Sequence, residues 1–367
     1  MSTLARSCVA GLLFGLAACA ADPMVYERSS ESATDQRPGK KAPGSDGDES
    51  GGAGTPGGNP DARSPSDDPS VVGPTAGTLD RPFPKATWLY DPIPANPVLD
   101  PGSAAMMANL NVTTNGRVLA LHEFGIPFYA ADAATPRKTV TCTEKDWGEC
   151  PFLAPGARPL VATFTPHVGS DGAMVVVDAS PRTGAMKGRT IDEYWIYQWN
   201  NGTPTTAWGG VTDLDGDGLK SPATGAGISR AAGVIRVKEL GAGKIDHALV
   251  FSTKFCKVDT FRHPASKEDG KYAGAGGVPE GARVQIDPSL NPDSYGLNKA
   301  ERAIMVALQK YGAYAIDCGG APMSFSAEDV PGDPGAPYLA VGIDGDYFSL
   351  GKLPWNQARV LASWNGK

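Results

Sequence analysis

The sequence lacks the motifs that mark the common enzyme classes. It has no Gly-x-Ser-x-Gly elbow, no Walker loop and no His-Glu-x-x-His helix, and Gly225-Ala226-Gly227 lacks the strand and helix that flank a dinucleotide-binding loop. Basic charge is also scarce, because 33 Lys and Arg face 40 Asp and Glu, a net charge of −7. Proteins that bind nucleic acids gain most of their affinity from basic side chains on phosphates. We therefore expect neither a nucleotide cofactor nor a nucleic-acid partner.

Residues that disfavour long helices, by contrast, are abundant. The 46 Gly and 32 Pro make up about a fifth of the 367 residues, and both disfavour helix interiors and central strands. A hydrophobic content of 41% is still enough for a packed core. This composition excludes a wholly disordered chain and favours a domain rich in turns.

The N-terminal segment predicts export. Arg6 precedes an apolar run, residues 9–18, that is too short for a membrane helix of ~20 residues but fits the core of a secretory signal peptide. The run ends in Leu16-Ala17-Ala18-Cys19, which resembles the lipobox of bacterial lipoproteins. The resemblance implies that residues 1–18 are a signal peptide and that lipidated Cys19 anchors the protein in the bacterial envelope. An ordinary signal peptide followed by a chance cysteine is the alternative.

The residues after Cys19 predict a tether. Residues 19–80 are rich in Gly, Pro, Ser and Asp, with no aromatic residue between Tyr26 and Phe83, so they cannot bury enough apolar surface to fold. Residues 20–80 hold 11 acidic and 5 basic side chains, whereas residues 81–367 hold 29 and 27. The acidity therefore belongs mainly to the tether. Neither Ala20 nor Ala21 is acidic, which favours the outer membrane by the simplest sorting rule for lipoproteins.

Residues 81–367 predict a single, mainly β domain. Short apolar or alternating segments punctuated by Gly, Pro, Asn and Asp favour an antiparallel β-sandwich or a jelly roll, with an α+β fold as the alternative. One prominent helix is expected at about residues 298–311, because Asn298 and Glu301 form a capping pair and Gly312 supplies the stop. A shorter helix is expected from Ser103 to Leu110. The expected strands are residues 117–122, 127–130, 160–164, 172–178, 193–199, 245–252, 282–287 and 313–317, with a turn at Asn200-Asn201-Gly202.

Four cysteines remain in the exported domain after Cys8 and Cys19 are set aside. An even number in an oxidising compartment predicts two disulfides, and three pairings are open. We favour Cys142–Cys150, which closes a short loop containing Trp147, together with Cys256–Cys318. A zinc site is the competing interpretation, but no Cys-x-x-Cys spacing supports it.

Several stretches of the domain resemble, in the same order, a group of secreted bacterial proteins. The resemblance implies one exported domain and assigns no catalytic residue. That group has Asn-Gly-Gly where this chain has Cys318-Gly319-Gly320, which implies that the second disulfide is particular to this chain. The stretches are residues 124–128, 169–178, 245–249, 281–288, 301–304, 307–314 and 317–320.

A row of aspartates suggests a cation site. Asp213, Asp215 and Asp217 alternate before Gly218, and alternating oxygens suit Ca²⁺. Thr224 occupies the twelfth position, where an EF-hand needs Glu, so the loop is no EF-hand. A loose calcium site is one interpretation and a solvent-exposed turn is the other.

Two further groups of residues point toward a carbohydrate ligand. A lyase acting on an acidic polysaccharide would use Arg or Gln to hold the carboxylate and Tyr or His to move a proton. For His247, a hydrogen-bonded core position is the alternative. The candidates for this chemistry are His247, Arg262, His263, Tyr272, Arg283 and Gln285.

The second group is aromatic and acidic. Trp195, Trp199 and Trp208 could form a platform for sugar rings or simply part of the core. A glycosidase would need two carboxylates that flank the cleaved bond, and the spacing of the acids singles out no pair. The acids considered are Asp192, Glu193, Glu239, Asp246, Asp287 and Asp317.

These features together predict a lipoprotein of the outer cell surface whose domain binds an extracellular polysaccharide and whose enzymatic activity is left open. The partners expected are the membrane, through the lipid, and a glycan. The alternative is a non-catalytic envelope or adhesion protein that binds another protein. A concave groove lined by Trp and convergent polar groups would favour the glycan, whereas a flat apolar patch would favour the protein partner.

Overall fold

The computed structural model describes residues 76–181, 188–332 and 335–367. The expected signal peptide, Cys19 and most of the expected tether lie outside these residues. The described residues belong to one compact unit, residues 68–367. Among the helices of this part of the chain, none combines the length and the apolar character needed to cross a membrane.

The longest helix forms where local sequence signals agree. Asn298 accepts a hydrogen bond from the main-chain N–H of Glu301, and the Glu301 carboxylate accepts one from the N–H of Asn298, which satisfies two donors at the helix start. After the helix, Gly312 has φ of +71°, a conformation that glycine adopts without steric cost. The helices are α1 (Thr87–Tyr90), α2 (Ser103–Leu110), α3 (Val237–Ala242), α4 (Lys299–Lys310) and α5 (Gly335–Leu339), with 3₁₀ turns η1 (Pro292–Tyr295) and η2 (Trp355–Gln357).

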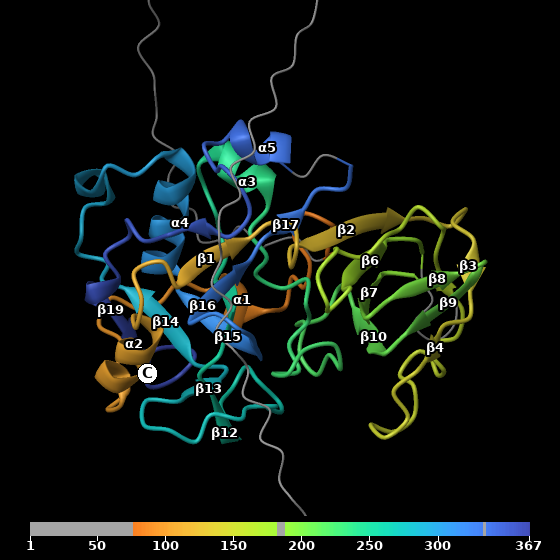
Figure 1. Cartoon of the computed structure of the whole chain (residues 1–367), viewed down its shortest axis with the longest axis horizontal. Coiled ribbons are helices and arrows are strands. Elements are labelled where there is room, and N and C mark those ends of the chain that lie inside the picture. Colours follow the sequence, from red (N-terminus) through yellow and green to blue (C-terminus); the bar gives the residue numbers. More distant parts are fainter. Residues whose placement is uncertain (1–75, 182–187, 333–334) are drawn as a thin grey trace, which may run out of the picture. The chain divides into compact units, whose positions relative to one another are not determined.

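A seven-stranded mixed sheet forms one layer, and α4 covers one of its faces (Figure 1). Ile304 and Leu308 of α4 pack in the same apolar cluster as Leu249 and Val284 of the sheet. In order across the sheet, the strands are β18 (Phe348–Ser349), β1 (Arg117–Ala120), β16 (Met323–Ser326), β11 (Leu249–Thr253), β15 (Ala313–Cys318), β14 (Arg283–Ile286) and β19 (Ala358–Val360).

A five-stranded sheet forms the second layer. Val175 and Val177 of this sheet share a buried apolar cluster with Val250 and Tyr314 of the seven-stranded sheet, so the two sheets pack on each other like a sandwich. On its other face, Met174 and Tyr194 pack with Phe152 in a third cluster. The strands in order are β10 (Trp208–Asp213), β7 (Thr190–Trp195), β6 (Met174–Asp178), β2 (Ile126–Ala131) and β17 (Glu328–Asp329).

Three small sheets complete the fold. The pair β12 (Cys256–Phe261) and β13 (Val278–Glu280) is parallel, and the pair β3 (Arg137–Lys138) and β5 (Arg158–Pro159) is antiparallel. The third contains β4 (Thr141–Cys142), β9 (Thr203–Thr206) and β8 (Gln198–Asn200), of which β8 and β9 form the predicted hairpin. Its turn places Asn201 and Gly202 at φ of +50° and +87°, as a type I′ turn requires.

The mainly β, sandwich-like fold is confirmed, and the pairing within both large sheets is mixed, since β1–β16, β11–β15 and β2–β6 are parallel. Both expected helices are present. The expected strand at residues 160–164 is wrong, because these residues form a turn after β5. The expected strand at residues 193–199 is interrupted, because Ile196 has φ of +52° and separates β7 from β8.

Both favoured disulfides are present. Cys142–Cys150 joins residues eight positions apart and closes a short loop, whereas Cys256–Cys318 joins residues 62 positions apart. Cys318 is the last residue of β15 and Cys256 the first of β12, so this bond ties the seven-stranded sheet to the β12–β13 pair. The competing zinc interpretation is therefore wrong for these four cysteines.

Candidate functional site

Two hollows meet in the described part of the chain. The larger has a volume of about 660 Å³ and the smaller about 460 Å³. Asp171, Arg230, Asp317 and Cys318 line both, so the hollows form one elongated cleft with polar residues at its middle. We call this the cleft.

Three tryptophans gather at the larger hollow. Trp195 of β7 and Trp208 of β10 are directly opposite partners in the ladder. Trp147 stacks on Trp195 with ring centroids 5.6 Å apart and an interplanar angle of 16°, and it meets Trp208 edge-on at 5.7 Å. Trp147 comes from the loop closed by Cys142–Cys150 and is 55% exposed. The three rings, which we call the tryptophan platform, present an aromatic surface at the cleft.

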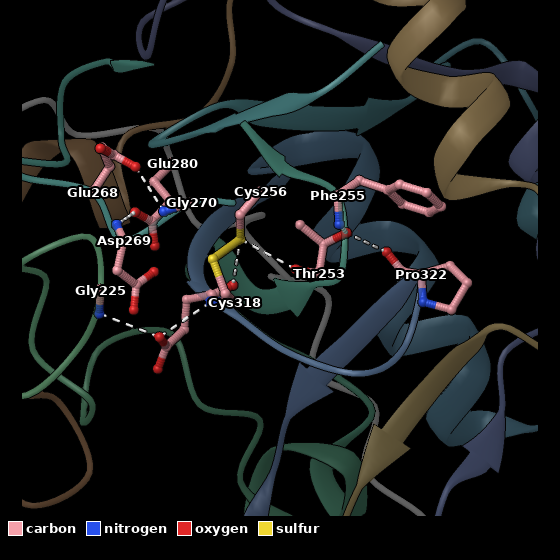
Figure 2. Close-up of a disulfide and its surroundings, with 11 residues drawn as sticks. Gly225, Thr253, Phe255, Cys256, Glu268, Asp269, Gly270, Glu280, Cys318 and Pro322 are labelled. Atoms are coloured by element: carbon pink, nitrogen blue, oxygen red, sulfur yellow. Dashed lines mark hydrogen bonds between the residues drawn. A yellow bond between two sulfur atoms is a disulfide. The ribbon is translucent and has the colours of Figure 1, made fainter. Parts of the chain in front are cut away.

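Three carboxylates converge at the same hollow. Asp317 is near the end of β15, Glu280 ends β13, and Asp269 lies in the segment between β12 and β13. One oxygen from each lies within 4.8 Å of the other two. Asp269 and Asp317 line the cleft, whereas Glu280 is fully buried behind them. Figure 2 shows Asp269 and Glu280 near Gly225 and the Cys256–Cys318 disulfide. We call Asp269, Glu280 and Asp317 the acidic triad.

Burial makes ionisation of the triad costly. Burial and the neighbouring Asp269 raise the pKa of Glu280 to about 8. Burial also raises the pKa of Asp317 to about 6, although the nearby Arg230 guanidinium opposes this shift. The Arg230 Nη2 atom lies 3.5 Å from Asp317 Oδ2. At neutral pH the triad therefore carries less negative charge than three free carboxylates would.

A fourth acid lies buried beneath the cleft. Glu193 of β7 is fully buried, and its two oxygens accept hydrogen bonds from the hydroxyls of Ser221 and Ser229. Burial raises its pKa to about 7, while the serine hydrogen bonds oppose the shift. Since Ser221 lines the cleft, the Glu193 side chain supports the cleft from inside the protein.

The structure divides the predicted aromatic platform. Trp195 and Trp208 lie together at the cleft, as expected of a platform. Trp199 lies on β8, with the Lys138 ammonium 5.9 Å from its ring, and does not line the cleft. Of the acids considered, Asp317 lines the cleft and Glu193 lies beneath it. Asp192 is buried in a salt bridge with Arg158.

Two of the predicted ligand-binding residues belong to the core. Arg283 is 1% exposed and donates hydrogen bonds to the carbonyls of Tyr311, Trp364 and Asp91. Gln285 is equally buried and bonds to Gln309 and Arg359. The two residues lie two positions apart on β14 and therefore on one face of the strand, and both side chains are buried within the protein. The prediction that they hold a substrate carboxylate is therefore wrong.

The histidines and their neighbours do not converge. The expected strand at residues 245–252 begins only at Leu249, so His247 precedes β11, and its ring bonds to Glu239 and to the Ala248 carbonyl. His263 meets Trp364 edge-on. Arg262 pairs with Asp100 at 2.8 Å beside a separate hollow. These contacts give the residues structural partners rather than a common site.

Tyr272 also lies outside the cleft lining. Its ring meets Phe255 edge-on, with centroids 5.3 Å apart, and it packs against the apolar cluster beside α4. The role expected of it, moving a proton on a substrate, would require a place beside the other candidates. The structure gives it a packing role instead.

The aspartate loop is a hydrogen-bonded turn. Asp215 gives both carboxylate oxygens to Arg189, and one of them also accepts from the Gly77 N–H. Asp213 and Asp217 accept from main-chain N–H groups two residues further on. Because Asp215 binds a guanidinium and the other two aspartates bind main-chain N–H groups, these contacts favour the interpretation of the loop as a turn over that of a loose calcium site.

Sequence reasoning missed several cleft residues. The sequence predicts Trp147 only as part of the disulfide loop, and the pairing of Cys142 with Thr206 of β9 brings that loop near the tryptophan-containing strands. Asp171, Arg230 and Asp269 lie in loops and carry no motif. Only contacts between distant segments bring them to the cleft.

Comparisons with known proteins assign no role to the cleft. No family model matches the chain, and neither the curated proteins nor the solved structures give a match.

Proposed function

We propose that this domain binds a polysaccharide outside the cell, in the cleft beside the tryptophan platform. The observation that carries the proposal is the stacking of the exposed Trp147 on Trp195 in the lining of the larger hollow, which also contains charged side chains. Sugar rings present C–H groups that pack on aromatic faces, while their hydroxyls need hydrogen-bonding partners. The cleft offers both, through its aromatic rings and through Asp171, Arg230 and Asp317.

The elongated form of the cleft supports a chain ligand over a flat protein surface. Two hollows that share their middle residues suit several consecutive sugar units. Cleavage would require two carboxylates that flank the scissile bond, and Asp171 and Asp317 line both hollows. Within the same proposal, the lipid on Cys19 would hold the domain at the outer membrane.

The binding test uses a panel of neutral and acidic polysaccharides with the purified protein. Trp147→Ala should weaken binding at least about tenfold, because losing one stacked ring costs roughly 1.4 kcal/mol. Trp199→Ala is the matched control, since this indole lies away from the cleft. Assays for new reducing ends and for unsaturated products on the same panel report cleavage. Equal affinities for the wild type and Trp147→Ala would reject the platform as the binding surface.

A further inference from the structure

The acidic triad has the geometry of a site for a hard divalent cation. Ca²⁺ binds oxygens at 2.3–2.6 Å, so two oxygens on one ion lie at most about 5 Å apart. The three oxygens of the triad meet this limit, because all lie within 4.8 Å of one another. The residues come from different segments, so their convergence is a property of the fold.

An unpaired buried oxygen provides the second observation. Glu280 is fully buried, and its Oε1 atom has no hydrogen-bond partner among the described residues. Its other oxygen accepts from the main-chain N–H of Asp269 at 3.1 Å, which fixes the carboxylate. A buried acceptor without a hydrogen bond destabilises the folded protein. The unpaired Oε1 and the Oδ1 atom of Asp269 both approach the same point beside Gly225, where a cation bound between the carboxylates would satisfy Oε1.

The surroundings hold the carboxylates in place and leave room between them. Asp317 Oδ1 accepts from the N–H groups of Gly225 at 3.2 Å and Cys318 at 3.1 Å. Side-chain oxygens of Asp269 and Glu280 both approach Gly225 so closely that a Cβ there would clash with each. Metal-binding carboxylates are commonly fixed by hydrogen bonds of this kind. Glycine at position 225 thus keeps the space in front of these oxygens open.

Charge and access also suit a cation. Three carboxylates converge, and the cations near them are Arg230, whose Nη2 atom lies 3.5 Å from Asp317, and Lys267 and Lys271, which interact electrostatically with Asp269. Asp269 and Asp317 line the cleft, which gives an ion a path from solvent and leaves positions for water or a ligand. Oxygen ligands without nitrogen or free thiolate favour Ca²⁺ over transition metals; the nearby Cys256 and Cys318 are joined in a disulfide.

We propose that Asp269, Glu280 and Asp317 bind one Ca²⁺ at the floor of the cleft. This site is separate from the aspartate loop at residues 213–217, and its occupancy does not depend on whether the cleft binds a polysaccharide. An ion there would present open coordination positions to the cleft, where hydroxyl or carboxylate oxygens of a ligand can bind.

The test is calorimetric titration of CaCl₂ into the full chain after removal of metals with EDTA. The wild type should bind one ion per chain, and Glu280→Gln and Asp269→Asn should each weaken binding at least tenfold. Asp217→Asn, in the aspartate loop, is the matched control and should bind as the wild type does. Circular dichroism checks that each variant is folded. If Glu280→Gln does not fold, Asp269→Asn still tests the site, because Asp269 is exposed.

Three results would overturn the proposal. These are the absence of binding at millimolar Ca²⁺, binding that neither triad variant alters, and binding that Asp217→Asn removes. Because the titration contains no polysaccharide, failure here leaves the glycan-binding proposal to its own test. Loss of glycan binding in Trp147→Ala, in turn, does not test whether the acidic triad binds Ca²⁺.

Discussion

Glu193 should make the protein less stable as the pH rises through neutrality. The carboxyl is fully buried beneath the cleft, and its pKa is raised from 4.5 to about 7. Between these values the folded protein holds a proton that the unfolded chain releases. The stabilisation is therefore complete below pH 4.5 and is lost as the pH rises through 7. At about 1.4 kcal/mol per pKa unit, the whole change is about 3 kcal/mol.

Replacement by glutamine isolates this contribution. Glu193→Gln keeps the shape and the hydrogen-bonding capacity toward Ser221 and Ser229 but does not titrate. Urea unfolding of both proteins at several pH values from 4.5 to 8.5, in EDTA, gives the free energy of unfolding. The wild type should lose about 3 kcal/mol relative to the variant across this range. Subtraction cancels the contributions of Glu280 and Asp317, whose raised pKa values act in both proteins.

A matched exposed carboxyl provides the control. Glu149 lies on the surface of the disulfide loop, and Glu149→Gln, measured in the same way, shows how much the removal of one exposed carboxyl alters the stability curve. Parallel stability curves for the wild type and Glu193→Gln would refute the reasoning, because they would mean that Glu193 ionises alike in the folded and unfolded states.

Two further predictions concern the lipid anchor and the disulfide loop that carries Trp147. Cys19→Ser should release the protein from the membrane fraction into the soluble fraction of cells, and unchanged fractionation would count against the lipid anchor. Replacing Cys142 and Cys150 together by serine should lower the free energy of unfolding by about 2–3 kcal/mol, as expected for a short closed loop, and should weaken polysaccharide binding, because Trp147 loses its fixed position. Unfolding curves and affinities that match the wild type would show that the bond does not position the platform.

Local signals made part of the fold predictable. The α4 helix follows from a capping pair and an apolar spacing that lie within about fifteen residues, and its observed bounds differ from the expected ones by a single residue at each end. The β8–β9 turn likewise depends on two adjacent residues whose backbone preferences are strong. Such elements need no knowledge of the rest of the chain.

The residues of β14 show where sequence reasoning stops. Alternation correctly places Arg283 and Gln285 on one face, but it does not say what covers that face. Arg283 is buried because carbonyls from Asp91, Tyr311 and Trp364 accept its hydrogen bonds, and two of these lie more than 80 positions away along the chain. Because these acceptors lie far from Arg283 in the sequence, its neighbours along the chain do not reveal that it is buried.

The acidic triad could not be predicted from the sequence for the same reason. Asp269, Glu280 and Asp317 span 48 positions, and they meet because β12 pairs with β13 and a disulfide joins Cys256 to Cys318. The separation of acids along the sequence does not indicate which of them strand pairing brings together in space. By contrast, the disulfide itself was predictable, because few cysteines leave few pairings.

The three tryptophans of the platform differ in how well their surroundings tolerate substitution. Trp195 and Trp208 face each other across a ladder whose strands also build the core, so substitutions near them disturb the fold. Trp147 belongs to a surface loop held at its two ends by Cys142 and Cys150. Residues between these cysteines can therefore vary in evolution while the scaffold stays unchanged. Related proteins should then differ in ligand preference mainly through this one loop, and exchanging it between them should transfer that preference.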